Sequence, residues 1–98
     1  MLSFPMKPVN LIAHIATPPE NLDEVVALLK EYGEHVLQMD GSERFEVFRN
    51  RDKDEVIVIE RYRDDDAFAL HLADPENEVL NAELAALTPG GSDLTFLV

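Results

Sequence analysis

The chain has 98 residues, which is enough for one domain with one hydrophobic core and too few for a second. Hydrophobic residues make up 46% of it and charged residues 29%, a composition that indicates a folded protein and argues against a disordered one. Its 20 acidic and 8 basic residues give a formal net charge of −12, which repels phosphate backbones and anionic lipids and argues against nucleic-acid binding.

The chain has no cysteine, which excludes a disulfide framework, a thiolate zinc site and a cysteine nucleophile. Residues 1–8 contain two prolines and no hydrophobic periodicity, so we expect a loosely ordered lead-in to a single domain over residues 9–98. No segment has the apolar length of a signal peptide or a membrane span. We therefore expect a soluble, cytoplasmic protein that does not bind membranes.

The first predicted strand covers Val9–Ala16, where alternation gives the strand two distinct faces. Asn10, Ile12 and His14 share one face, and Leu11 lies on the other. The polar side chains add hydrogen-bonding groups to a cleft if their face looks toward the helices, and are interface residues if it looks toward a partner subunit. The pattern leaves both alternatives open.

A helix is predicted to begin at Asn21, which has the spacing of a capping box with Glu24. It is expected to end near Gly41, because glycine tolerates the left-handed conformation of a helix C-terminus. Its apolar residues recur at helical spacing and form one stripe. They are Leu22, Val25, Val26, Leu29, Tyr32 and Val36.

Residues 43–50 and 55–63 are predicted to form an antiparallel hairpin around a polar turn. In the first strand, Phe45 and Val47 alternate with Arg44, Glu46 and Phe48. The centre of the second, residues 56–59, is apolar on both faces, which is typical of a strand buried on both sides.

Three aspartates at residues 64–66 suit the positive end of a helix and predict that a second helix begins there. Pro75 either ends this helix or begins the next one in its first turn. The following segment carries an apolar stripe, and residues 94–98 form a terminal strand after a turn at residues 89–91. The stripe consists of Val79, Leu80, Leu84 and Leu87.

The resulting order, β-α-β-β-α-β, predicts an α+β, ferredoxin-like fold with a four-stranded antiparallel sheet. The helices cover one face of such a sheet and leave the other bare. Because residues 56–59 direct apolar side chains to both faces, we expect a second copy of the chain to cover the bare face in a homodimer. The alternative is that this face is only moderately apolar and stays in water.

Glu60-Arg61-Tyr62, then His71-Leu72 and Asp74-Pro75, resemble in order and spacing the antibiotic biosynthesis monooxygenase family. Supporting similarities are a first strand followed by proline and a strand at residues 45–49 after a Gly-Ser turn. The resemblance extends over residues 9–98 and implies that two copies form a dimeric α+β barrel. Family members of known activity insert oxygen from O₂ into hydroxyaromatics or quinols without flavin, haem or metal. It therefore implies a monooxygenase that needs no cofactor and acts on a small apolar or aromatic substrate.

The candidate catalytic residues are His71 as a base, with Tyr62 and Asn10 positioning a substrate oxygen. The alternative for His71 is a packing role with one satisfied nitrogen, and for Tyr62 a rim position with its hydroxyl in water. Further candidates for substrate contact are Ile12, His14, Phe45, Val58 and Phe68. The aromatic ones could stack on a planar substrate or simply belong to the core.

Members that oxidise polyketide aromatics carry tryptophan, asparagine and tyrosine where this chain has Tyr62, Val58 and Phe68. These departures favour an alternative function, a non-catalytic binder or isomerase of a small metabolite on the same dimeric fold. A structural association module is a further alternative. The haem-degrading relatives have an asparagine on the first strand and a late histidine, whereas this chain has no histidine after His71, so haem degradation is not expected. The histidines lack metal-ligand spacing, and no metal site is predicted.

Overall fold

The computed structural model describes residues 7–98, and the expected α+β, ferredoxin-like fold is confirmed there. In chain order the elements are strand β1 (Val9–Ala16), the 3₁₀ turn η1 (Pro19–Asn21), helix α1 (Leu22–Val36), strands β2 (Ser42–Arg49) and β3 (Glu55–Tyr62), helices α2 (Asp65–Ala73) and α3 (Pro75–Leu87), and strand β4 (Ser92–Leu97). The first six residues of the expected lead-in lie outside the described residues.

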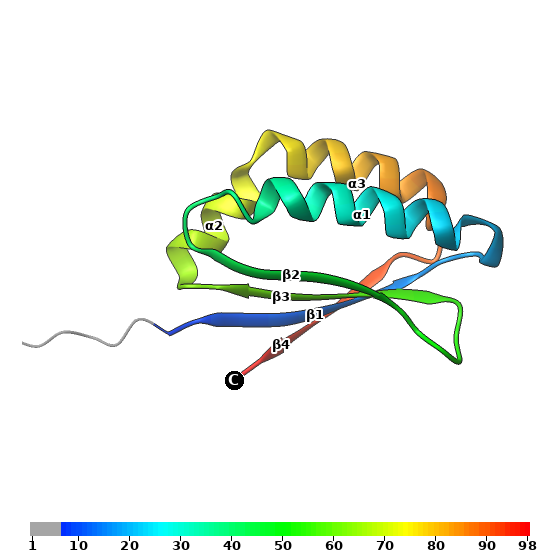
Figure 1. The fold of residues 1–98 in the computed structure, drawn as a ribbon, viewed down its shortest axis with the longest axis horizontal. Coiled ribbons are helices and arrows are strands. Elements are labelled where there is room, and N and C mark those ends of the chain that lie inside the picture. Colours follow the sequence, from blue (N-terminus) through cyan, green and yellow to red (C-terminus); the bar gives the residue numbers. More distant parts are fainter. Residues whose placement is uncertain (1–6) are drawn as a thin grey trace, which may run out of the picture.

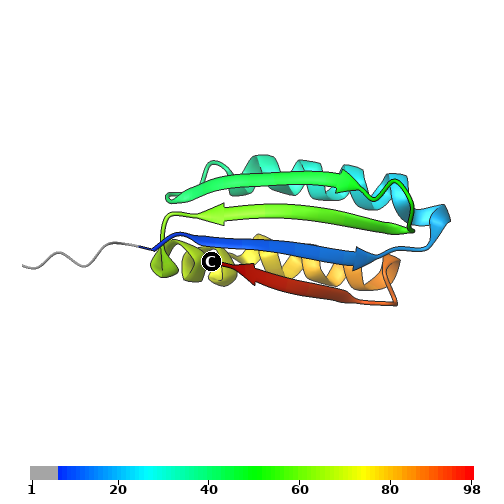
Figure 2. The ribbon, with the colours of Figure 1, turned by 90° about the horizontal axis from the view of Figure 1, so that it is seen from below.

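The four strands form one antiparallel sheet in the order β2-β3-β1-β4. In the register at the centre of the sheet, Ile12 of β1 lies opposite Ile59 of β3 and opposite Thr95 of β4. Helices α1 and α3 lie side by side over one face, with α2 at one end (Figure 1). Seen from below, the other face of the sheet is uncovered (Figure 2). The chain therefore has two layers and one open face.

The core lies between the covered face of the sheet and the apolar stripe of α1. Alternation along the two central strands places every second side chain in this layer, and the predicted stripe of α1 packs against it with Val26 partly buried. The inward residues of the two central strands are Leu11, Ala13 and Ile15 of β1 and Val56, Val58, Glu60 and Tyr62 of β3.

The capping box predicted at Asn21 is wrong. Asn21 has helical backbone angles (φ −105°, ψ −3°), and its side chain caps no backbone N–H of α1. Its amide instead donates to the backbone oxygen of Leu87 at 3.0 Å. Because η1 leads straight into α1, the backbone does not adopt the extended conformation that an N-cap needs, and the side chain joins two helix ends instead.

The end of α1 and the stripe of α3 also differ from prediction. Helix α1 ends at Val36, and Gly41 (φ +80°) lies in the turn that leads into β2. Of the two alternatives for Pro75, ending the second helix or beginning the next one, the structure shows the latter, because Pro75 is the first residue of α3. Val79 is 58% exposed, because only Leu80, Leu84 and Leu87 face the sheet at helical spacing.

The open face has an apolar centre and polar ends. Ile12, Ile57 and Ile59 point outward from the two central strands and are partly exposed. At one end Arg61 donates to Asn10 (3.2 Å), and at the other the His14 ring lies 3.4 Å from Glu55.

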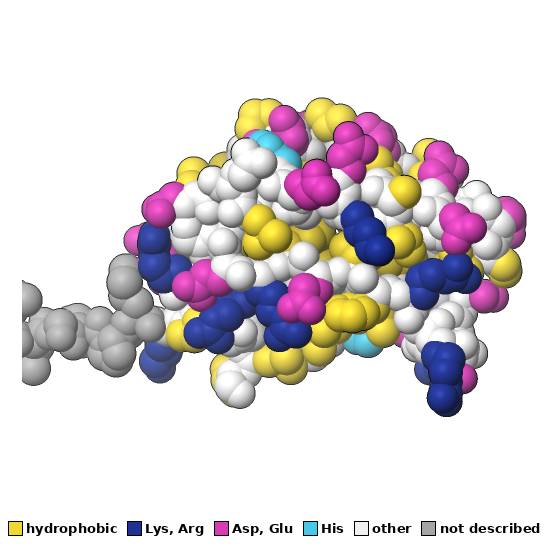
Figure 3. Space-filling model, viewed as in Figure 1, with side chains coloured by type: hydrophobic (Ala, Val, Ile, Leu, Met, Phe, Trp, Pro, Cys, Tyr) yellow, Lys and Arg dark blue, Asp and Glu magenta, His cyan; other side chains and the backbone are white. Residues whose placement is uncertain are grey.

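Charge is unevenly distributed over the face of the molecule that Figure 3 shows. Acidic side chains are spread over the helical layer, whereas lysine and arginine side chains gather lower, toward the sheet (Figure 3). Among residues 7–98, no helix combines the length and apolar character needed to cross a membrane.

Candidate functional site

A cavity of about 300 Å³ lies between the covered face of the sheet and the helices. This volume is at the lower end of the range of small-molecule sites. Its walls are mostly apolar, and four of its polar groups gather where β3, α1, α2 and α3 meet. These four are Tyr32, Glu60, His71 and Asn77, and Asn81 and Ser92 also line the cavity. Leu94 is 54% exposed although it lines the cavity, so the cavity opens between β4 and the helices.

Glu60 and His71 lie together at the polar end, and both are nearly buried. Their side chains are 10% and 7% exposed. The Tyr62 hydroxyl donates to Oε1 of Glu60 at 2.5 Å, and Nε2 of His71 lies 3.7 Å from the same oxygen. The last distance exceeds a hydrogen bond, but catalytic contacts are often longer before substrate binds.

The second ring nitrogen of His71 faces the Tyr32 hydroxyl. Nδ1 lies 3.5 Å from the Tyr32 hydroxyl oxygen, and that hydroxyl donates its proton to Oδ1 of Asn77 at 3.1 Å. Because the Tyr32 proton is directed at Asn77, the Tyr32 oxygen acts as an acceptor for His71. This arrangement favours the neutral tautomer with the proton on Nδ1, in which Nε2 has a free lone pair.

Burial changes the acid–base properties of this cluster. It raises the pKa of Glu60, while the hydrogen bond from Tyr62 acts in the opposite direction. It lowers the pKa of His71, against the effect of the Asp74 charge. The pKa values of Tyr32 and Tyr62 also rise, mainly because of burial. The phenols are thus neutral donors beside a neutral imidazole.

Local sequence explains why these groups meet. Alternation along β3 directs Glu60 and Tyr62 inward. Asp64 then caps α2 by accepting a hydrogen bond from the Ala67 backbone N–H at 2.8 Å, which holds the pKa of Asp64 below its usual value. The short α2 folds back over the end of β3. The His71 ring stacks on Tyr62 with 4.9 Å between ring centroids.

The structure brings five of the expected site residues together. Phe45, Val58, Phe68 and His71 line the cavity, and Tyr62 packs beneath the His71 ring with its hydroxyl bound to Glu60.

The structure separates the other three expected residues from this group. Asn10, Ile12 and His14 point to the open face of the sheet, because Leu11 and Ala13 occupy the inward positions of β1. Within one chain, they do not reach the cavity. The sequence left open whether this face looks toward the helices or toward a partner subunit. In the structure it looks away from the helices.

Sequence reasoning missed Glu60, Asn77 and Asn81 as cavity residues. Glu60 could have been found, because it shares the inward alternation of β3 with Val58. Asn77 also left a signal, since it lies three residues before Leu80 on the inward stripe of α3.

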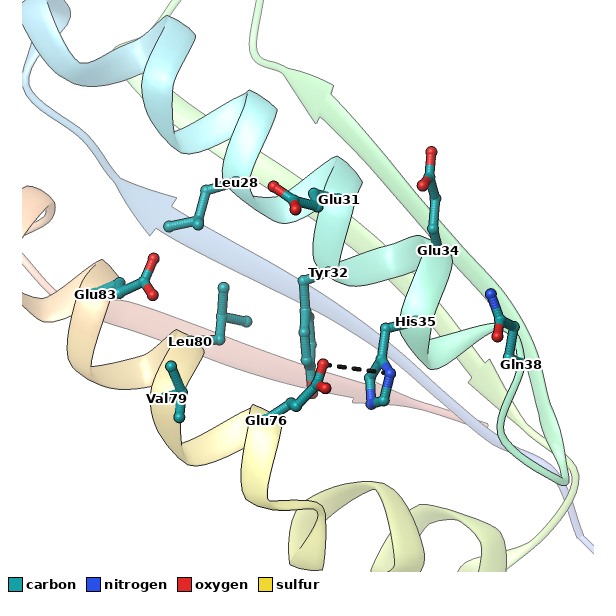
Figure 4. A pocket seen from close by; sticks show the side chains of 10 residues that line it. All are labelled: Leu28, Glu31, Tyr32, Glu34, His35, Gln38, Glu76, Val79, Leu80 and Glu83. Carbon is teal, nitrogen blue, oxygen red and sulfur yellow. Dashed lines mark ion pairs between the residues drawn. The ribbon is translucent and has the colours of Figure 1, made fainter.

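A second, wider hollow of about 610 Å³ lies on the outer surface between α1 and α3 (Figure 4). Its sides carry Glu31 and Glu83, and His35 lies 2.6 Å from Asp74 and 3.3 Å from Glu76. Tyr32 lines both this hollow and the inner cavity. In residues 7–98, no three His, Cys, Asp or Glu side chains are arranged to hold a metal ion.

Comparisons with known proteins agree with this architecture. The family model described as antibiotic biosynthesis monooxygenase matches residues 8–81. Rv0793 from Mycobacterium tuberculosis has a similar structure, with a TM-score of 0.85, 25% identity and coverage of 94% of each chain. SnoaB from Streptomyces nogalater, a cofactor-independent oxygenase, has a TM-score of 0.81 and 23% identity over 93% of this chain and 91% of its own.

PA3566 from Pseudomonas aeruginosa has a TM-score of 0.84 and 20% identity over 97% of this chain and 96% of its own. No curated protein matches the sequence. At these identities, the likeness to SnoaB and PA3566 concerns the fold.

Proposed function

The chain belongs to the antibiotic biosynthesis monooxygenase family, and from this premise we propose that it is a cofactor-independent monooxygenase acting on a hydroxyaromatic or quinol. The observation that carries the proposal is the position of His71 at the polar end of an otherwise apolar cavity, with Nδ1 facing the Tyr32 hydroxyl and Nε2 available to accept a proton. A buried imidazole whose pKa lies below its ordinary value is neutral at physiological pH and can accept a proton.

The chemistry needs a base and a dry cavity, because the substrate itself reduces O₂. His71 removes a proton, and the electron-rich substrate anion combines with O₂ as a peroxide. When the substrate is an anthrone, its CH₂ group becomes C=O, one oxygen atom enters the product and the other leaves as water. All electrons come from the substrate, so the balance requires no external reductant.

The cavity favours a flat molecule of a few rings with its hydroxyl group at the polar end. Its walls include Phe45 and Phe68, which can stack on an aromatic ring. The Tyr62 hydroxyl is already bound to Glu60, so Tyr62 supports the site by orienting Glu60 and His71. With Asn10 on the open face, Asn77 is a cavity amide near His71 that can contact a substrate oxygen.

The test is O₂ uptake by the metal-free protein with a panel of naphthols, naphthoquinols and anthrones. We expect uptake faster than autoxidation, and His71→Ala should reduce it by roughly 10²-fold or more. The control is Leu70→Ala, which changes a half-exposed residue of the same helix outside the cavity and should keep the activity. Uptake at the autoxidation rate across the panel would contradict the proposal, as would full activity of His71→Ala.

A second candidate function is binding or isomerisation of a small metabolite without oxygenation. It is favoured by Val58 and Phe68, which make the cavity apolar at two positions where polyketide-oxidising members are polar. A raised melting temperature with the same panel, with no O₂ uptake, would support this alternative.

We also propose that the protein functions as a homodimer joined through the open face of the sheet. The isoleucines at the centre of this face and the polar contacts at its ends resemble an interface with an apolar core and a polar rim. Packing of a second copy would remove these isoleucines from water, in agreement with a dimeric α+β barrel.

A further inference from the structure

We propose that Glu60 and His71 form a proton-sharing pair, in which Glu60 stabilises or receives the proton that His71 takes from the substrate. The pairing stands on the geometry of the free protein. Its use in catalysis rests on the proposed monooxygenase function. Glu60 acts through His71 and is therefore a positioning residue for the base.

Packing does not explain why a carboxyl group occupies position 60. The preceding inward positions of β3 are Val56 and Val58, and an apolar side chain would continue the same layer. Glu60 is the one carboxyl group that lines the inner cavity in the described part of the chain. A buried carboxyl group destabilises a fold unless it has partners; the hydrogen-bond partner here is the Tyr62 hydroxyl, and the His71 ring lies 3.7 Å away.

The two side chains are oriented for transfer between them. Tyr32 accepts the hydrogen bond from Nδ1 of His71, which leaves the Nε2 lone pair on the side of Glu60. Oε1 of Glu60 lies 3.7 Å from Nε2. Once Nε2 carries the proton from the substrate, a small rotation of either side chain brings this N–H into hydrogen-bond range of Oε1. Stacking on Tyr62 keeps the ring of His71 in this plane.

The proton balance follows from this arrangement. Before reaction the carboxylate carries one negative charge and His71 is neutral. The substrate O–H or C–H bond breaks, an N–H bond forms at Nε2, and the proton stays there or passes to Oε1. Either way the pair becomes neutral, so it does not repel the substrate anion that faces it. After O₂ has added, the pair returns this proton to the outer peroxide oxygen, which gives a hydroperoxide. In an anthrone the second C–H bond of the same carbon then breaks as the O–O bond breaks; the pair takes this proton and passes it to the departing hydroxide, which leaves as water.

Acid–base properties support such sharing. Burial raises the pKa of Glu60 and lowers the pKa of His71, which moves the two values toward each other. The other titratable groups that influence His71 come from three elements and from the α2–α3 junction. The Asp74 charge raises the pKa of His71 and the His35 charge lowers it, Tyr32 and Tyr62 contact its ring, and Glu76 on α3 pairs with His35.

The first test needs no substrate and is therefore independent of the proposed function. Nitrogen-15 NMR of the three histidines, with His71→Ala for assignment, reports the tautomer and the pKa of His71. We expect the Nδ1–H tautomer, and a lower His71 pKa in Glu60→Gln, because the carboxylate that favours the imidazolium is gone. Glu83→Gln removes a carboxylate from the outer hollow and should leave the His71 pKa unchanged. The Nε2–H tautomer, or an unchanged pKa in Glu60→Gln, would overturn the pairing.

The second test uses any substrate that the O₂-uptake panel identifies. Glu60→Gln should lower kcat by about 10- to 100-fold with little change in KM, and should move the acidic limb of the kcat/KM profile to lower pH. Glu60→Asp retains a carboxyl group and should recover part of kcat. It also provides a test of position 60 if Glu60→Gln does not fold. A Glu60→Gln enzyme with the wild-type pH profile would refute the role of the pair in catalysis. A wild-type protein without oxygenase activity would contradict the proposed function and leave the NMR result to decide the pairing.

Discussion

Replacing Tyr62 by phenylalanine tests how much the buried carboxyl group of Glu60 depends on one hydroxyl. The aromatic ring remains, so its packing against His71 and Phe68 is kept, and the 2.5 Å hydrogen bond to Glu60 is lost. A hydrogen bond to a charged group contributes about 1.5–3 kcal/mol. Because Tyr62 is fully buried, water cannot easily replace its hydroxyl. We expect a loss of about 2 kcal/mol in the free energy of unfolding at pH 7, which lowers Tm by about 8–16 °C.

The loss of stability in Tyr62→Phe should depend on pH. Burial raises the pKa of Glu60 above its value in the unfolded chain, so the folded state binds this proton more tightly and loses stability as pH rises between the two pKa values. The Tyr62 hydrogen bond lowers the pKa of Glu60 and so limits this loss. Without it the pKa of Glu60 rises further. The deficit of Tyr62→Phe should therefore be larger at pH 7 than at pH 4, where a protonated Glu60 loses only a neutral hydrogen bond of about 1 kcal/mol.

Urea unfolding followed by circular dichroism at both pH values measures these differences. The matched control is Tyr32→Phe, which also removes a buried hydroxyl, but one whose partners are the Asn77 amide and the His71 imidazole and not a carboxylate. It should lose about 1 kcal/mol at pH 7, and this loss should not grow between pH 4 and pH 7, because the hydroxyl has no bond to Glu60. Equal losses for the two variants at pH 7, or the same loss for Tyr62→Phe at both pH values, would refute the reasoning.

Two further predictions concern the fold and the proposed dimer. In the same urea experiment, Gly41→Ala should destabilise the protein by about 1–3 kcal/mol more than Gly91→Ala. Both glycines have positive φ, but a new Cβ at Gly41 would lie 2.4 Å from the Cβ of Ala67, whereas one at Gly91 would have no atom within 4 Å. Equal losses would show that the turn relaxes. Ile59→Asp places a charge at the centre of the open face and should convert a dimeric wild type into a monomer by light scattering, whereas Val79→Asp on the helical side should not. A monomeric wild type at micromolar concentration would contradict the dimer.

The strands were the most predictable part of the fold because alternation is a local property. The first strand was predicted with its observed bounds, and Glu55–Tyr62 ends one residue before the predicted end. The prediction of a cap at Asn21 was wrong because the spacing to Glu24 contains no information about Leu87. The fold brings Leu87 beside Asn21, and the Asn21 side chain binds its backbone oxygen instead. The predicted burial of Val79 was wrong for a related reason. Helical spacing shows which residues share a side of the helix, but it does not show where the buried part of that side ends.

The candidate site was predictable only in part. Resemblance to the family pointed to His71, and the structure places it at the polar end of a cavity. Alternation showed that Asn10 and His14 share a face with Ile12, but no local pattern tells which face of a strand meets the helices. Glu60 was missed because carboxylates usually lie in water, and its burial depends on α2 folding back over the end of β3.

Strand β3 explains how one sheet can separate chemistry from association. Its inward residues include Glu60 and Tyr62 of the acid–base cluster, and its outward residues include Ile59 of the proposed interface. Neighbours in sequence thus lie on opposite sides of the sheet, where the backbone layer keeps their side chains apart. An outward substitution should therefore change the association state without changing the tautomer of His71. A shift of β3 by one residue would exchange the two faces and would destroy both features at once, so the register with β1 is a requirement of the site as well as of the fold.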